Sequence, residues 1–153
     1  MGFQKVGVLG SGIMGSGIAE VAAATGATVI VRSRSQATGE AMLATMATSL
    51  TKQIEKGKRT AEDAEAIVQR VSATTHMADL SDCDFIIESV VEDLEVKRLV
   101  FRELNDVVKP EAILATNTST LSVIELAMET SRPDRVCGLH FFNPAPAMSL
   151  VEV

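Results

Sequence analysis

Three glycines near the start of the chain, Gly10, Gly12 and Gly15, have the spacing of a loop that binds a dinucleotide. An apolar segment precedes this glycine loop and another follows it, as expected for a strand that leads into a helix. Gly10 allows a tight turn, Gly12 lets a pyrophosphate approach the backbone, and Gly15 lets the helix pack closely on the sheet. The phosphates would then lie on free amides of the first helical turn, beside Ile13 and Met14. We predict a dinucleotide site here; the alternative is a plain turn between strand and helix.

The segment after the second predicted strand bears on the choice of cofactor. Sites for NAD carry an acidic residue roughly 20 residues after the glycines, where it binds the adenosine ribose hydroxyls. This chain has Arg32, Ser33 and Arg34 at that place and no carboxylate. A hydroxyl between two guanidinium groups can bind a phosphomonoester through charged, forked hydrogen bonds. We therefore predict that NADP is favoured over NAD, the alternative being two solvated surface arginines.

Composition bounds the class of protein. The chain has 153 residues, of which 46% are hydrophobic, and this suits one α/β domain. Lysine and arginine number 14 against 20 acidic residues, a net charge of −6, so we expect no nucleic-acid or membrane partner. Cys83 and Cys137 lie far apart, which predicts reduced core thiols in a cytoplasmic protein and no metal site. The sequence shows neither a leader pattern nor a long apolar span.

Strands and helices alternate along the chain. The predicted strands are 6–9, 28–31, 71–74, 85–91, 112–116 and 136–140, and the predicted helices are 13–25, 36–56, 61–70, 94–107 and 121–128. With right-handed crossovers, this order gives an α/β fold of Rossmann type: a doubly wound, mostly parallel sheet with helices on both faces. Met42, Met46, Leu50 and Ile54 recur every four residues along one helix face, which predicts core packing. Ligands are expected at the carboxyl ends of the strands.

Residues 115–121 and 138–153 carry two further motifs. Together with the glycine loop and residues 92–97, they resemble the L-3-hydroxyacyl-CoA dehydrogenases, including the 3-hydroxybutyryl-CoA enzymes. The resemblance extends over essentially the whole chain. It implies that His140 is the catalytic acid and base, and that Glu152 orients and polarises it.

The same resemblance assigns binding roles to other side chains. Ser119 is expected to contact the substrate oxygen. The resemblance implies that Glu92, Lys97 and Asn143 line the cofactor site, and we also expect Asn117 to bind the cofactor. Ser49 and Lys56, on the second predicted helix, are expected to meet the CoA moiety of an acyl-CoA substrate.

The residue types suit this chemistry. Oxidation of a secondary alcohol moves a hydride to the nicotinamide C4 while a base removes the hydroxyl proton, and imidazole is well matched to that proton transfer near neutral pH. The Glu152 carboxylate can bond the other ring nitrogen of His140 and fix its tautomer. His76 lies in a polar predicted loop, and we expect no catalytic role for it.

The family that the chain resembles has a second, helical domain, which supplies most of the dimer contact, part of the acyl-CoA pocket and a catalytic asparagine. The resemblance implies that residues 1–153 are the cofactor-binding half alone, with dimerisation depending on the second domain. Two alternatives stay open. One is a β-hydroxyacid dehydrogenase acting on a free acid, which the segment from His140 to Glu152 disfavours because those enzymes typically use a lysine base from a later helix. The other is a non-catalytic nucleotide-binding module.

Overall fold

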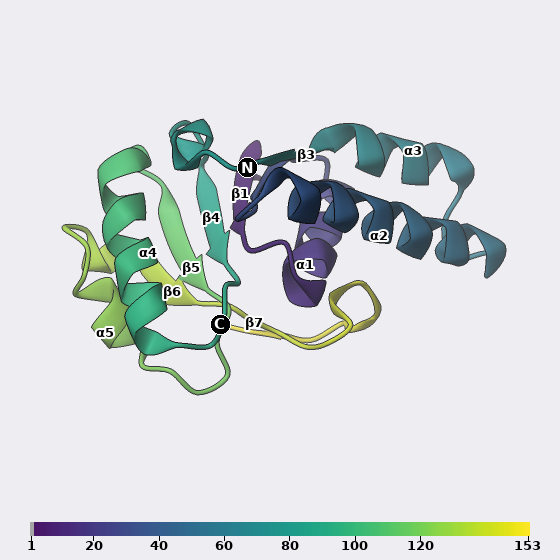
Figure 1. Ribbon diagram of the computed structural model, residues 1–153. Coiled ribbons are helices and arrows are strands. Elements are labelled where there is room, and N and C mark those ends of the chain that lie inside the picture. The colour runs from purple at the N-terminus through teal and green to yellow at the C-terminus, as the bar shows by residue number, and fades with distance from the viewer. Residues whose placement is uncertain (1) are drawn as a thin grey trace.

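Parallel strands form the central sheet of the protein, as seen in a computed structural model that describes residues 2–153. The strands are β1 (Lys5–Leu9), β2 (Thr28–Arg32), β3 (Val71–Thr74), β4 (Phe85–Glu88), β5 (Ile113–Thr116) and β6 (Val136–Gly138). Their order across the sheet is β3-β2-β1-β4-β5-β6, and each neighbouring pair is parallel. The predicted doubly wound α/β fold is therefore confirmed, and its two halves meet between β1 and β4 (Figure 1).

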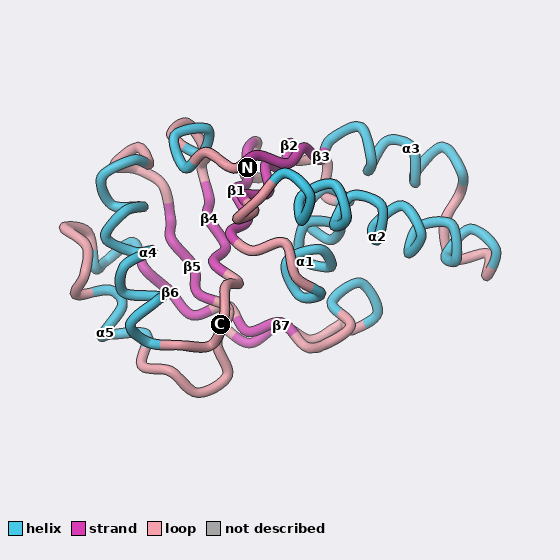
Figure 2. Tube along the Cα trace, viewed as in Figure 1, coloured by secondary structure: helices cyan, strands magenta, loops and turns pink. Residues whose placement is uncertain are grey.

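Helices cover the sheet from both sides (Figures 1 and 2). The helices are α1 (Ile13–Ala24), α2 (Gln36–Glu55), α3 (Ala61–Arg70), α4 (Leu94–Val107) and α5 (Val123–Ala127), with short 3-10 turns at η1 (Met77–Leu80), η2 (Pro133–Arg135) and η3 (Ala145–Ala147). One buried cluster joins α1, α2 and α3 to β1, β2 and β3, and a second joins α4 and α5 to β4 and β5. Within residues 2–153, no helix has the length and apolar character needed to cross a membrane.

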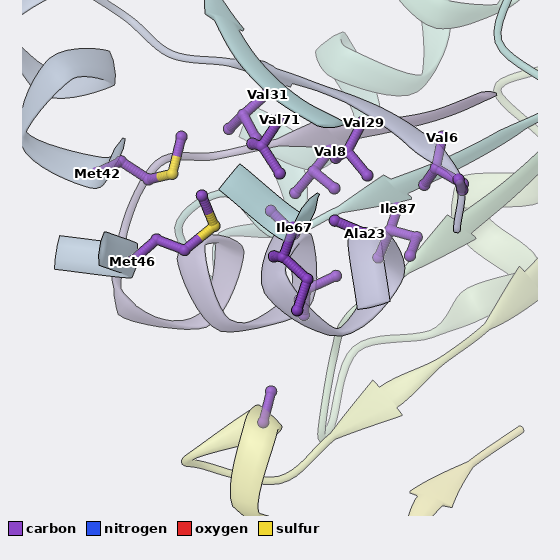
Figure 3. Close-up of a cluster of buried hydrophobic side chains, with 14 of the residues drawn as sticks. Val6, Val8, Ala23, Val29, Val31, Met42, Met46, Ile67, Val71 and Ile87 are labelled. Atoms are coloured by element: carbon purple, nitrogen blue, oxygen red, sulfur yellow. The ribbon is translucent and has the colours of Figure 1, made fainter. Parts of the chain in front are cut away.

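Figure 3 shows the core that lies under α1, α2 and α3. Met42, Met46 and Leu50 of α2 are each at most 2% exposed, which confirms their predicted packing. Ile54 was predicted to lie in the same core, but it is 37% exposed. The 20 residues of α2 span about 30 Å, whereas the five-residue strands span about 17 Å, so the last turn of the helix extends beyond the sheet.

A small hairpin follows β6 and divides the strand predicted over 136–140. Leu139 donates its N–H to the carbonyl of Thr116, the last residue of β5, at 2.9 Å. Because β5 ends at Thr116, the chain cannot continue to pair with it and leaves the sheet. It then forms the antiparallel pair β7 (His140–Phe141) and β8 (Val151–Glu152), with η3 in the connecting loop.

The remaining differences from the predicted elements are local. The strand predicted over 85–91 ends at Glu88, because the Val90 N–H bonds the Glu88 carboxylate instead of a neighbouring strand. The helix predicted over 121–128 begins only at Val123, because the Leu121 N–H bonds the Thr118 hydroxyl in a turn.

The two cysteines occupy different environments. Cys83 is fully buried, as predicted, and burial raises the pKa of its thiol to about 11. Cys137 was also predicted to lie in the core, but it is only partly buried because β6 is an edge strand.

Candidate active site

The glycine loop has the geometry that its sequence predicts. Gly10 has a φ of +106°, and a Cβ there would lie 2.3 Å from the Ser89 carbonyl oxygen. A Cβ on Gly15 would lie 1.9 Å from the Gly10 carbonyl oxygen, so α1 can approach the end of β1 only without a side chain at this position. A Cβ on Gly12 would meet nothing within 4 Å. The loop is therefore closed where it packs on the protein and open where a ligand would approach.

A cavity of about 850 Å³ lies beside this loop, at the carboxyl ends of β1, β2, β4 and β5. It brings together most of the residues that the sequence nominated. The nominated residues that line it are Gly10, Gly12, Ile13, Met14, Arg32, Arg34, Glu92, Asn117, Ser119, His140 and Asn143. Segments that are more than 100 residues apart in the chain thus share one site.

The sequence reasoning missed part of the wall of this cavity. The additional lining residues are Ser11, Ser89, Val90, Val91, Val96, Val100, Phe141 and Phe142. Ser89, Val90 and Val91 were detectable in principle, because they follow β4 at the point where the strand order reverses and ligands gather in such folds.

Arg32 and Arg34 face the cavity, whereas Ser33 does not. Arg32 is partly buried, and its Nε is buried without a hydrogen-bond partner in residues 2–153. Ser33 is 2% exposed and its hydroxyl donates to the Ser35 carbonyl, so it stabilises the turn before α2 instead of facing a ligand. The predicted contact from Ser33 to a phosphate is therefore corrected. The two guanidinium groups remain as the positive charge at this end of the cavity.

His140 and Glu152 form a direct pair. They lie opposite one another in the β7–β8 hairpin, and the imidazole Nδ1 is 2.8 Å from a Glu152 carboxylate oxygen. The ring of Phe142 lies 4.6 Å from the imidazole centre and restricts it from one side. With Nδ1 held by the carboxylate, Nε2 is the nitrogen left to exchange a proton with a ligand in the cavity.

Glu92 joins the cavity wall to the loop after β5. One of its carboxylate oxygens accepts the Thr118 hydroxyl and, at 3.3 Å, the Ser119 N–H. Burial alone would raise the pKa of Glu92, but the hydrogen bonds from Thr118 and Lys97 and the charge of Lys97 lower it below its usual value. Glu92 is therefore a carboxylate that holds Ser119 at the cavity.

Lys97 does not line the cavity, contrary to the prediction. Its side chain is fully buried, and its ammonium group lies 3.0 Å from Glu88, 3.0 Å from Glu92 and 3.1 Å from the Asn117 carbonyl oxygen. An ammonium group has three N–H donors, and these three acceptors use all of them. Lys97 therefore supports the wall from behind.

Asn117 connects three segments at the same edge. Its amide nitrogen donates to the Ser89 hydroxyl at 3.2 Å, and its side-chain oxygen accepts the Phe141 N–H at 3.0 Å. The ends of β4 and β5 and the hairpin that carries His140 are thus held in register.

A second cavity, of about 590 Å³, lies between α2 and the loop that contains η3. Ser49 and Lys56 line it, together with Lys52 and Lys58. Gln53 donates to the Ser49 hydroxyl at 3.2 Å and to the buried Glu20 carboxylate at 2.5 Å. This site combines three ammonium groups with hydroxyls, a composition that suits a phosphorylated ligand.

Comparison with known proteins matches residues 5–153 to a family described as 3-hydroxyacyl-CoA dehydrogenase, NAD binding domain. The chain belongs to the 3-hydroxyacyl-CoA dehydrogenase family. It is 48% identical over 150 residues to a 3-hydroxybutyryl-CoA dehydrogenase of Clostridioides difficile, a match that covers 98% of this chain and 53% of the relative. Another 3-hydroxybutyryl-CoA dehydrogenase, from Bradyrhizobium diazoefficiens, is 45% identical over 98% of this chain and 51% of its own length.

Solved structures agree with this family assignment. The crystal structure of (S)-3-hydroxybutyryl-CoA dehydrogenase from Ralstonia eutropha has a TM-score of 0.95 and 38% identity, covering 98% of this chain and 53% of that one. The chain thus spans about half the length of the relatives it matches, and it corresponds to the NAD-binding domain of the 3-hydroxyacyl-CoA dehydrogenases.

The residues at the larger cavity fit a nicotinamide dinucleotide. The glycine loop leaves space at Gly12, and α1 begins there without a side-chain cap, so its first amides are free for a pyrophosphate. The unpartnered Nε of Arg32 is a further donor that a ligand can satisfy. NAD(P) binding therefore agrees with both the family and the geometry.

Proposed function

We propose that this domain serves an enzyme that moves a hydride between NAD(P) and C3 of a short-chain 3-hydroxyacyl-CoA, such as the 3-hydroxybutyryl-CoA and acetoacetyl-CoA pair. The observation that carries the proposal is the position of His140, paired with Glu152, on the same cavity as the glycine loop. This arrangement combines a proton-transfer group with a dinucleotide site. The names of the relatives supply the substrate class.

In this proposal, His140 accepts the proton of the substrate hydroxyl at Nε2 when the alcohol is oxidised, and it returns that proton in the opposite direction. Glu152 holds the ring tautomer through Nδ1 and stabilises the imidazolium that forms. Ser119, positioned by Glu92, donates its hydroxyl to the substrate oxygen. The bound cofactor supplies the nicotinamide C4 that takes or gives the hydride.

We further propose that NADP is the favoured cofactor. Arg32, the last residue of β2, and Arg34 line the cavity at the place where an acidic residue would exclude a 2′-phosphate. Their guanidinium groups can hold such a phosphate with forked hydrogen bonds. Asn143, at the same cavity, is proposed as a further cofactor contact.

The second cavity is proposed to bind the CoA part of the substrate. Its lysines, Lys52, Lys56 and Lys58, suit CoA phosphates, and Ser49 adds a hydroxyl. We propose that the enzyme is cytoplasmic and that it dimerises through the helical second domain of the family.

Cofactor titration tests the proposal directly. The chain has no Trp and no Tyr, so the fluorescence of NADPH or NADH reports binding without protein background. We expect saturable binding of both, with NADPH tighter, and turnover of acetoacetyl-CoA when this domain is joined to the second domain. Cofactor binding without turnover by the joined protein would support the non-catalytic module instead, and failure to bind either cofactor would overturn the proposal.

A further inference from the structure

Behind the wall of the larger cavity lies a buried charged cluster that consists of Glu88, Lys97 and Glu92. Glu88 and Lys97 have fully buried side chains, and that of Glu92 is 40% exposed toward the cavity. Lys97 contacts both carboxylates at 3.0 Å. The cluster therefore holds two carboxylates against one ammonium group and has a surplus of one negative charge.

The hydrogen bonds around Glu88 leave the negative charge of its carboxylate in place. One carboxylate oxygen accepts the Val90 N–H at 2.6 Å, and the other accepts the Thr116 hydroxyl at 2.7 Å and Lys97. All three groups donate to the Glu88 carboxylate, an arrangement that suits its negative charge. The sequence shows the same residue as a charge at the end of an otherwise apolar strand.

This cluster adjoins the surface that a cofactor would meet. Ser89, Val90 and Glu92, which follow Glu88 in the chain, line the cavity, and so does Asn117, whose carbonyl accepts Lys97. A charge surplus in such a poorly solvated place is weakly screened and acts on a ligand in the cavity.

We infer that Glu88 and Glu92 bias the cofactor site toward the oxidised, cationic nicotinamide. The inference rests on the proposed function. When the oxidised ring accepts a hydride at C4, it gains two electrons and a proton and loses its positive charge, while the alcohol carbon is oxidised and the hydroxyl proton passes to His140. A fixed surplus of negative charge stabilises the cationic ring before the hydride transfer more than it stabilises the neutral ring afterwards. The two carboxylates thus set the ratio of the affinities for oxidised and reduced cofactor.

The test compares dissociation constants for oxidised and reduced cofactor, measured by calorimetry on the 153-residue chain. Glu92→Gln keeps an acceptor for Ser119 and removes one charge. We expect this variant to weaken binding of the oxidised cofactor relative to binding of the reduced cofactor by about three- to tenfold. Glu88→Gln is expected to shift the ratio in the same direction although this side chain does not reach the cavity. Glu95→Gln is the matched control, because Glu95 is a solvent-exposed residue on the first turn of α4.

A purely structural role for the cluster would change both affinities by one factor and leave their ratio unaltered. An unaltered ratio in Glu92→Gln therefore overturns the inference, as does an equal shift in the Glu95→Gln control. Should Glu88→Gln prove unfolded by circular dichroism, the Glu92→Gln ratio decides alone. Failure of the parent chain to bind either form would refute the proposed function instead, so the two failures are distinguishable.

Discussion

The two sides of the larger cavity are built in different ways. The glycine side, residues 10–15 with Arg32 and Arg34, depends on backbone shape: a positive φ at Gly10 and missing side chains at Gly12 and Gly15. The network side, which comprises Glu88, Glu92, Lys97, Asn117 and Ser119, depends on hydrogen bonds and ion pairs built around the buried side chains of Glu88 and Lys97. Two short segments of chain make the glycine side, whereas the network side joins residues up to 31 apart in the sequence and, through Phe141, the hairpin that carries His140.

The difference separates two tasks. Backbone amides and guanidinium groups on the glycine side can bind the phosphates of a cofactor whatever its redox state. The network side positions Ser119 and the hairpin that carries His140, which we propose meet the reacting atoms, and chemistry tolerates little displacement of such groups. Substitutions on the network side should therefore change turnover and stability. Substitutions on the glycine side should change the choice of cofactor.

The largest expected effect is on turnover. In a protein that joins this domain to the helical second domain proposed above, His140→Gln should reduce turnover of acetoacetyl-CoA by roughly 10²- to 10⁴-fold while cofactor affinity stays nearly unchanged. Steady-state kinetics and NADPH fluorescence measure the two quantities. Glu152→Gln should also reduce turnover, because an amide can hold the ring but stabilises imidazolium poorly. If Glu152→Gln were as active as the parent, the pair would have to be abandoned while His140 could keep its role.

The next effect is on stability. Lys97→Met removes the ammonium group that three acceptors share and leaves two carboxylates without their counter-charge, which should cost about 3–5 kcal/mol of unfolding free energy. Urea denaturation followed by circular dichroism measures this loss. Lys52→Met is the matched control, because this lysine lies on the exposed side of α2, and it should change little. A loss below about 1 kcal/mol in Lys97→Met would show that the network is not what holds this side together.

The two sides also differ in how much of each could be predicted from the sequence. The glycine loop was predictable because its requirements are local: each glycine acts on atoms of its own turn or of the adjacent strand end. The fold followed from the alternation of apolar segments, and the resemblance to a known family supplied the roles of His140 and Glu152. The structure adds that these two residues are cross-strand partners, which their separation of 12 positions in the sequence does not reveal.

The network side was only partly predictable, because burial depends on contacts that are distant in sequence. Lys97 was expected at the cofactor, yet it is fully buried behind Glu92. Glu88 was visible as a charge that interrupts the apolar run 85–91, but its partners Thr116 and Lys97 come from other elements. The Ser33 hydroxyl was also expected to face a ligand. It donates instead to a carbonyl only two residues away, a local contact that the sequence did not reveal either.

Cofactor choice should respond to the glycine side alone. Arg34→Ala should weaken NADPH by about 1–3 kcal/mol, the value of a charge-assisted hydrogen bond, and leave NADH nearly unaffected. Fluorescence titration of the two cofactors gives the difference. Arg102→Ala is the control, because that guanidinium is paired with Glu129 and neither residue lines the cavity. Equal effects on NADPH and NADH would refute the proposed phosphate contact.

The smallest expected effect concerns the amino ends of the strands, opposite the cavity, where Asp84 joins the starts of β1 and β4. Its carboxylate accepts Lys109 at 2.6 Å and the N–H groups of Lys5 and Gln4 at 2.9 Å each. The Lys109 hydrogen bond, followed by those from the two N–H groups, lowers the pKa of Asp84 to about 2 from an ordinary value of 3.8. Because the folded pKa is the lower one, this contribution to stability is complete above about pH 4 and is lost as the pH falls toward 2.

Asp84→Asn should therefore be less stable than the parent at pH 7, by a few degrees in melting temperature, and the difference should shrink between pH 4 and pH 2. Thermal melts across that range measure it, with Glu103→Gln on the exposed side of α4 as the control. Cofactor affinity at pH 7 should be unchanged, because this carboxylate lies at the amino ends of the strands, away from both sides of the cavity. A difference in stability that stayed constant down to pH 2 would mean that the Asp84 charge contributes nothing beyond its hydrogen bonds.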